Sequence, residues 1–91
     1  MTDTLYYRSE NVVFSEVEDE TVLLHTESDK AYGLDEAAAF VWDQLGDEGK
    51  SCAQLVDVIM ATYEVDRDRA SDDTQRLLDH MARENLLTCN N

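Results

Sequence analysis

The first part of the chain follows strand-like patterns. Residues 11–17 and 21–26 are rich in β-branched and aromatic side chains, which is typical of strands. The run Val22-Leu23-Leu24 is apolar on both faces, so we expect 21–26 to be a middle strand. Residues 30–34 follow a polar turn and predict a short third strand, in which Gly33 indicates a bulge or a close approach of another backbone. The pattern predicts an antiparallel meander with 30–34 at one edge.

After Leu34 the apolar spacing changes to that of helices. Asp35 is a good N-cap for a helix that runs to about Leu45, and the segment 51–54 fits a capping box that opens a second helix. Asp66 can cap a third helix over roughly 67–85. The positions expected to face the core are Ala37, Phe40, Val41 and Leu45, with Trp42 at their flank, then Leu55, Val58, Ile59 and Tyr63, then Ala70, Thr74, Leu77, Leu78 and Met81.

Strands followed by helices in one short chain predict the α+β class. The expected architecture is winged-helix-like, with a three-stranded antiparallel sheet followed by three helices in the order β-β-β-α-α-α. A length of 91 residues predicts a single domain over 1–91, with its core at about 11–87. Apolar residues make up 43% of the chain, which is enough to build a core.

Charge excludes several classes of partner. Seven Lys and Arg stand against 21 Asp and Glu, giving a net charge of −14. This surface would repel nucleic acid and anionic membranes, and the predicted third helix is too acidic for a DNA-reading helix. A basic protein or peptide partner is compatible with the charge, as is a simple role of the acids in solubility. The chain has no signal-like start and no apolar run long enough to span a membrane. Its two cysteines do not make a disulfide framework, which favours a reducing compartment, so we expect a cytoplasmic protein.

No catalytic constellation is recognisable. The histidines, His25 and His80, read as partly exposed surface residues, and together with Cys52 and Cys89 they do not form a zinc pattern. Cys52 lies at a predicted helix N-terminus, which can lower a thiol pKa, but it has no evident partner. The glycines do not form a phosphate loop. We therefore expect no enzyme activity, no metal and no cofactor.

Several short motifs follow one another in a distinctive order over residues 11–87. They are Leu23-Leu24, a polar turn at 27–29, Tyr32, Leu34-Asp35-Glu36, Val41-Trp42, Tyr63-Glu64-Val65-Asp66 and Glu84-Asn85-Leu86-Leu87. In this combination the chain resembles the PqqD-like family, also called the RiPP recognition element. The resemblance implies a non-catalytic peptide chaperone. It would bind the leader of a ribosomally made precursor peptide by strand addition. It would then present that leader to a radical S-adenosylmethionine enzyme, a peptidase or another modifying enzyme.

The resemblance places the leader beside the third strand, in a cleft formed with the third helix. An edge strand at 30–34 has unpaired backbone groups that an extended peptide can complete. The expected contacts are Lys30, Ala31, Tyr32, Gly33 and Leu34 on the strand and Arg67, Ser71, Thr74 and Leu78 on the helix. Leu78 would supply an apolar floor and Arg67 would meet a leader carboxylate. Tyr32, Leu34, Thr74 and Leu78 also fit a plain core role.

Two further questions stay open at the level of sequence. The acids of the third helix call for a leader that is basic or apolar there, but the product class could be a lasso-peptide, radical-enzyme or quinone-cofactor system. The alternative function is a structural or dimerising adaptor without leader recognition. An exposed edge strand can pair with a second copy of itself, so a homodimer through that edge is compatible with either function.

Overall fold

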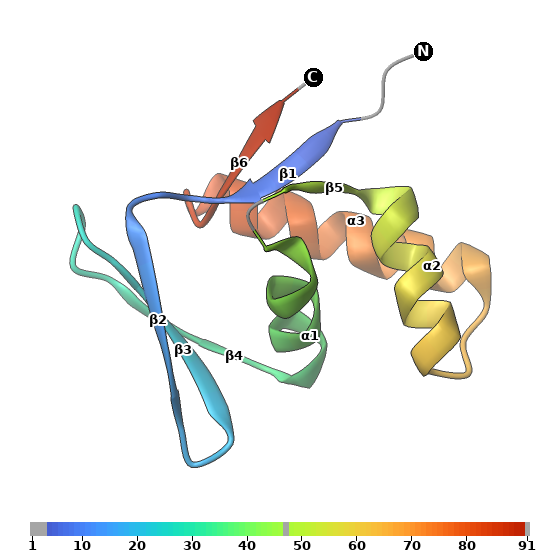
Figure 1. Cartoon of the computed structure of the whole chain (residues 1–91), viewed down its shortest axis with the longest axis horizontal. Coiled ribbons are helices and arrows are strands. Elements are labelled where there is room, and N and C mark those ends of the chain that lie inside the picture. The colour runs from blue at the N-terminus through green and yellow to red at the C-terminus, as the bar shows by residue number, and fades with distance from the viewer. Residues whose placement is uncertain (1–3, 47, 91) are drawn as a thin grey trace.

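The strands form two antiparallel sheets rather than the one sheet expected. Across the residues that it describes, 4–46 and 48–90, the computed structural model contains three helices and six strands (Figure 1). The first sheet has the order β5-β1-β6 and the second has the order β2-β3-β4. The elements are β1 (Leu5–Arg8), β2 (Val12–Val17), β3 (Glu20–His25), β4 (Ala31–Leu34), α1 (Glu36–Leu45), β5 (Lys50–Ser51), α2 (Cys52–Thr62), α3 (Arg67–Arg83) and β6 (Leu87–Asn90).

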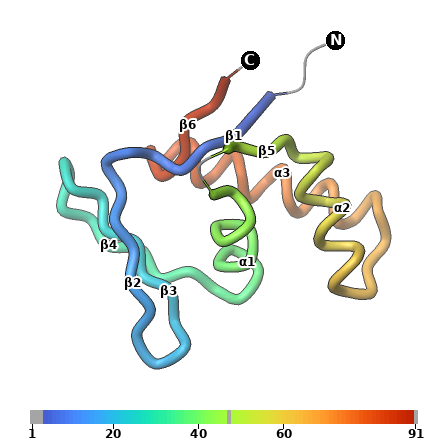
Figure 2. Tube along the Cα trace, viewed as in Figure 1, coloured from blue at the N-terminus to red at the C-terminus, as the bar shows by residue number. Residues whose placement is uncertain are grey.

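The second sheet is the meander that the sequence predicted. β3 lies between β2 and β4, which confirms it as the middle strand and β4 as an edge. Its core face carries Leu23 and His25, and alternate residues point away from the helices. A tight turn joins β2 to β3, with Glu18 and Asp19 both at positive φ, 49° and 68°. In the Cα trace this hairpin projects at one side of the molecule (Figure 2).

Two of the three predicted helix caps are present. The Asp35 carboxylate accepts a hydrogen bond from the Ala38 amide at 2.8 Å, and Ser51 and Gln54 form the complete capping box. The Asp66 side chain makes no capping bond at the start of α3. The α3 helix ends at Arg83, two residues earlier than expected, because Asn85 adopts a left-handed φ of 62° that turns the chain into β6.

One hydrophobic core joins both sheets to all three helices. Trp42, expected at the flank of its helix, is fully buried at the centre. The Phe14 ring meets it edge-on, with centroids 5.8 Å apart. Arg8 stacks on both rings and donates to the Trp42 carbonyl at 2.6 and 3.0 Å. Tyr6 also belongs to the core, so the packed region begins before residue 11. Within the described residues, none of the helices is long and apolar enough to cross a membrane.

Candidate functional site

The outer edge of β4 is open. β4 pairs with β3 in the register Leu23 opposite Tyr32, and no strand in the described part of the chain pairs with its other side. The His25 amide donates to the Lys30 carbonyl at 3.0 Å, so this pair is of the hydrogen-bonded type. Such pairs alternate along an antiparallel ladder. Tyr32 therefore points its backbone groups toward β3.

Ala31 and Gly33 take the alternate positions on β4. Their amides and carbonyls consequently point away from β3, which leaves two donors and two acceptors along the open edge. Both residues are exposed. A Cβ atom built on Gly33 would meet nothing within 4 Å, and Gly33 shows no positive φ. The expected close approach of another backbone at Gly33 is therefore not found among the residues that the structure describes.

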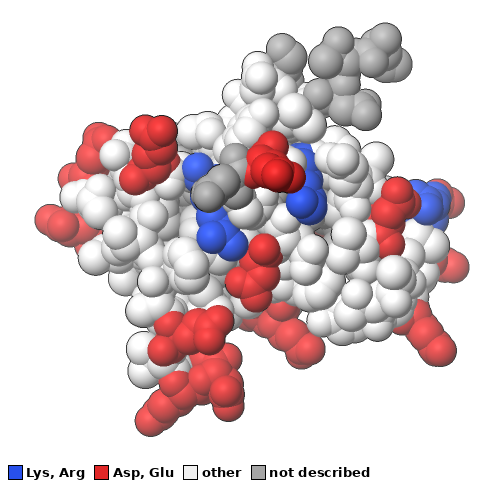
Figure 3. Space-filling model, in the orientation of Figure 1, with Lys and Arg blue, Asp and Glu red and all other residues white. Residues whose placement is uncertain are grey.

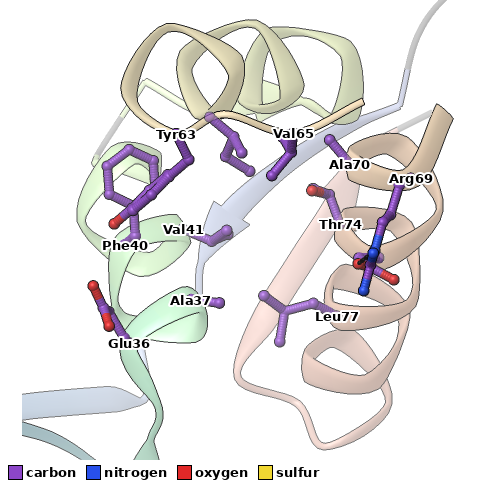
Figure 4. A pocket seen from close by; sticks show the side chains of 12 residues that line it. Glu36, Ala37, Phe40, Val41, Tyr63, Val65, Arg69, Ala70, Thr74 and Leu77 are labelled. Atoms are coloured by element: carbon purple, nitrogen blue, oxygen red, sulfur yellow. Dashed lines mark ion pairs between the residues drawn. The ribbon is translucent and has the colours of Figure 1, made fainter. Parts of the chain in front are cut away.

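An apolar groove continues from the end of β4. It has a volume of about 380 Å³ and lies between α1, the segment that follows α2, and α3 (Figure 4). Its floor and walls are mainly apolar, and the Phe40 and Tyr63 rings meet edge-on with centroids 5.4 Å apart. The lining residues are Glu36, Ala37, Phe40, Val41, Ile59, Tyr63, Val65, Arg69, Ala70, Asp73, Thr74 and Leu77.

Charged groups occupy only the borders of the groove. Glu36 lies at the α1 side, and Arg69 on α3 pairs with Asp73 at 3.8 Å (Figure 4). Both members of that pair are largely exposed, so solvent screens their attraction. The two acids and one arginine leave the groove border with a small negative excess. The groove therefore suits a bound peptide in which an apolar side chain enters the groove and a basic residue lies beside it, near the border.

Tyr32 connects the open edge to α3. Its hydroxyl donates a hydrogen bond to Glu84 Oε2 at 3.1 Å, immediately after the end of that helix. Desolvation and the Glu84 carboxylate both raise the pKa of Tyr32, so the hydroxyl keeps its proton and its role as a donor. Because β4 passes through Asp35 directly into α1, the same edge leads into the groove wall formed by Glu36 and Phe40.

The strand predicted at 30–34 begins one residue later, so Ala31, Tyr32, Gly33 and Leu34 form β4 and Lys30 lies immediately before it. Lys30, Ala31 and Gly33 are exposed at the edge. Tyr32 and Leu34 are half-buried and pack against the core, as the alternative interpretation allowed.

The predicted helix residues are only partly at the groove. Thr74 lines it, although it is just 4% exposed. Leu78 is fully buried in the core and cannot act as an accessible floor. Arg67 turns toward α2 and pairs with Asp57 at 2.8 Å, and the Ser71 carbonyl faces the Cys52 thiol. Arg67, Ser71 and Leu78 thus lie on other faces of α3.

Sequence reasoning missed the groove side of the helices. On α3 the groove takes Arg69, Asp73 and Leu77, which are close in sequence to the expected residues but rotated around the helix axis. Ala37 and Phe40 were expected in the core and instead line the groove. The available signal was the continuous apolar run 37–42 on α1, which covers more of the helix surface than the four residues that the core buries, Ala38, Val41, Trp42 and Leu45.

The described part of the chain offers little reactive chemistry. Burial, with the Asp79 charge, raises the pKa of both the Cys52 and Cys89 thiols, so neither is activated as a nucleophile. His25 is buried rather than partly exposed, and its Nδ1 accepts hydrogen bonds from the amides of Glu27 and Ser28 in the β3–β4 turn. No group of three or more potential metal ligands occurs among the residues described.

Fold and site together define a small α+β domain with an open strand edge that runs into an apolar groove between helices. Residues 20–87 match the family model of Coenzyme PQQ synthesis protein D (PqqD), and the chain therefore belongs to the PqqD family. We found no match to the chain among curated proteins.

Solved structures agree with this assignment. "TbiB1 in Complex with the TbiA(beta) Leader Peptide" is 37% identical, with a TM-score of 0.81, over 89% of this chain and 93% of that chain. "Lasso peptide synthetase B1 complexed with the leader peptide" has the same fold at 21% identity, with a TM-score of 0.72, over 94% and 98% of the two chains. The PqqD part of Methylobacterium extorquens PqqCD, described as a stand-alone RiPP recognition element, is 21% identical, with a TM-score of 0.75, over 92% and 88%.

Proposed function

We propose that this chain binds the leader segment of a ribosomally made precursor peptide and has no catalytic activity of its own. The single observation that carries the proposal is the open β4 edge beside an apolar groove. Membership of the PqqD family and the likeness to the TbiB1 leader-peptide complex support it. The description of the PqqD part of PqqCD as a stand-alone recognition element supports a binding role without catalysis.

The leader adds a strand to β4 through Ala31 and Gly33. Four main-chain hydrogen bonds, each worth about 0.5–1.5 kcal/mol net, give roughly 2–6 kcal/mol before the cost of ordering the peptide. This term is nearly independent of sequence, because the bonds involve only backbone. Specificity therefore comes from side chains that enter the groove.

The groove selects an apolar residue of the leader. Burying one such side chain against Phe40, Val65 and Leu77 contributes about 1.5–3 kcal/mol. Glu36 and Asp73 at the border favour a Lys or Arg next to that residue. A leader that uses both features binds more weakly as salt is added, whereas a purely apolar leader does not.

The bound leader is presented to a modifying or cleaving enzyme in the cytoplasm. A titration with a synthetic leader, taken from a short reading frame encoded beside this chain, tests the proposal by fluorescence anisotropy. We expect saturable binding in the micromolar range or tighter, and at least tenfold weaker binding of a scrambled peptide of the same composition. Equal binding of both peptides would overturn the proposal.

The dimerising adaptor remains the competing function. It requires β4 to pair with β4 of a second copy, which brings two chains of charge −14 together. Sedimentation over a range of concentrations separates the two functions. A monomer that binds the leader supports the proposal, whereas a dimer that the leader does not dissociate supports the adaptor.

A further inference from the structure

The second sheet carries an apolar face that no other part of residues 4–46 and 48–90 covers. The helices lie to one side of these strands (Figure 1; Figure 2). On the other side, Val13, Val17 and Leu24 are 51%, 57% and 39% exposed, and Val22 is half-buried between them. Val13 lies directly opposite Leu24 in the register of β2 and β3. We call Val13, Val17, Val22 and Leu24 the outer patch.

Acidic residues surround the outer patch at both ends of the hairpin. Between residues 10 and 30 the chain has one lysine, Lys30, and no arginine. None of the acids of this described segment forms an ion pair with a cation. In the space-filling view, red side chains gather at the two ends of the β2–β3–β4 region with uncharged surface between them (Figure 3). These acids are Glu10, Glu18, Asp19, Glu20, Glu27 and Asp29, whereas Glu16 lies opposite Thr21 on the other face of the sheet.

We propose that the outer patch docks the enzyme that acts on the bound precursor peptide. The contact surface of that enzyme is apolar at its centre and carries Lys and Arg around it, because this complements the patch and its acidic border. The inference rests on the proposed function, since it assigns a surface to the partner that receives the leader. It adds a second binding face, which is separate from the leader site.

The geometry allows both faces to be occupied together. The leader pairs with β4 and so extends the second sheet within the plane of that sheet. The side chains of the leader reach the groove on the side of the helices. The outer patch belongs to the opposite face of the same sheet and lies mainly on β2 and β3. A docked enzyme therefore leaves the β4 edge open, and a bound leader leaves the outer patch exposed.

Charge argues against a second copy as the occupant. Two outer patches facing each other would bring two unneutralised acidic borders together, in chains that each carry a charge of −14. Like charges in contact across an interface cost several kcal/mol. A basic border on the partner removes that cost and also speeds association.

The β2–β3 turn offers a variant that separates docking from folding. Glu18 and Asp19 both have positive φ, a conformation in which Asn-Gly is the favoured pair in two-residue hairpins. Changing Glu18→Asn together with Asp19→Gly should therefore stabilise the hairpin while it removes two border carboxylates. A loss of enzyme binding in a more stable protein cannot be ascribed to unfolding.

The experiment uses the whole chain, immobilised, and the modifying or cleaving enzyme encoded beside it as the probe. Val13→Lys with Leu24→Lys should weaken enzyme binding at least about tenfold, and the turn variant should slow association and reduce its salt dependence. Leader affinity, measured separately, should stay within about twofold of the unmodified chain. The groove variant Val65→Ser is the reciprocal control, since it should weaken leader binding and leave enzyme docking unchanged.

Three results would overturn the inference. They are an enzyme that does not bind the unmodified chain, enzyme affinity that is unaffected by both outer variants, and a dimer of the unmodified chain that Val13→Lys with Leu24→Lys converts to monomer. A failure of the leader to bind would instead overturn the proposed function. Because the two affinities are measured separately, the two failures are distinguishable.

Discussion

Replacing Ala31 with proline tests the open-edge geometry directly. The Ala31 amide points away from β3, so proline removes a donor at the edge without breaking the ladder that holds β4 in place. The proline ring also occupies the space of the amide hydrogen, where the backbone of an added strand must approach. The Ala31 side chain is a methyl group on the face away from the core, so little packing changes.

The expected loss follows from the hydrogen bonds of one residue. Ala31 offers the leader one donor and one acceptor. Proline removes the donor, and its ring keeps the added strand away from the remaining acceptor, so losing both bonds costs about 1–3 kcal/mol and weakens binding roughly 5- to 150-fold. Fluorescence anisotropy with a labelled synthetic leader measures the affinity. Urea denaturation of the same samples should give a free energy of unfolding within about 1 kcal/mol of the unmodified chain.

Glu16→Pro is the matched control at the other open edge of the same sheet. The Thr26 amide donates to the Asn11 carbonyl at 2.7 Å, so Asn11 and Thr26 are a hydrogen-bonded pair. Such pairs alternate along β2, and the Glu16 amide therefore points away from β3, toward the open side of the sheet. This variant should leave leader affinity unchanged. The reasoning is refuted if folded Ala31→Pro binds the leader normally, or if Glu16→Pro is the variant that loses binding.

The remaining predictions concern the groove and the elements that hold it. Val65→Ser should weaken leader binding about fivefold or more, while the matched change Val17→Ser on the outer patch leaves it unchanged; anisotropy titrations that show equal effects would contradict the groove. Ser51→Ala should cost about 0.5–2 kcal/mol of stability in urea without altering leader affinity. Tyr32→Phe removes the bond to Glu84 and should lower the free energy of unfolding at neutral pH. Because the fold raises the Tyr32 pKa above its ordinary value of 10.0, this contribution is complete below that pH and is lost above it, so the two proteins should converge in alkaline urea titrations.

Local signals allowed the sequence to predict much of the architecture. The Ser51 and Gln54 capping box involves neighbours in the chain, so its residues predict the start of α2 without knowledge of the rest. The run at Val22 to Leu24 favoured a middle strand, and β3 does lie between β2 and β4. The outer face of that strand is nevertheless uncovered, so Leu24 is 39% exposed.

The first sheet could not be predicted because its strands depend on distant partners. β5 has two residues, and β6 is a mostly polar strand of four residues. Neither has an alternation that would distinguish it from a loop. They pair with β1, which is anchored by burial of Tyr6 and by the hydrogen bond from Gln75 Nε2 to the Tyr6 hydroxyl at 3.0 Å.

Of the candidate site, the sequence predicted the strand edge but not the groove, again because the groove depends on contacts between distant segments. The edge at Ala31 and Gly33 follows from the order of the strands along the chain. The groove depends on how α3 is rotated, and Leu77 and Leu78 are equally apolar in sequence. Packing buries Leu78 in the core and turns Leu77 toward the groove, a distinction that only the tertiary structure makes.

Amide chemical shifts of the labelled chain, followed by NMR during titration with the synthetic leader, test the central claim most directly. The account predicts the largest shifts at Ala31 and Gly33, with further shifts at groove residues such as Val65 and Leu77, and slowed amide exchange at Ala31 and Gly33. Shifts confined to β2 or β6, or no shifts at saturating peptide, would contradict strand addition at the β4 edge.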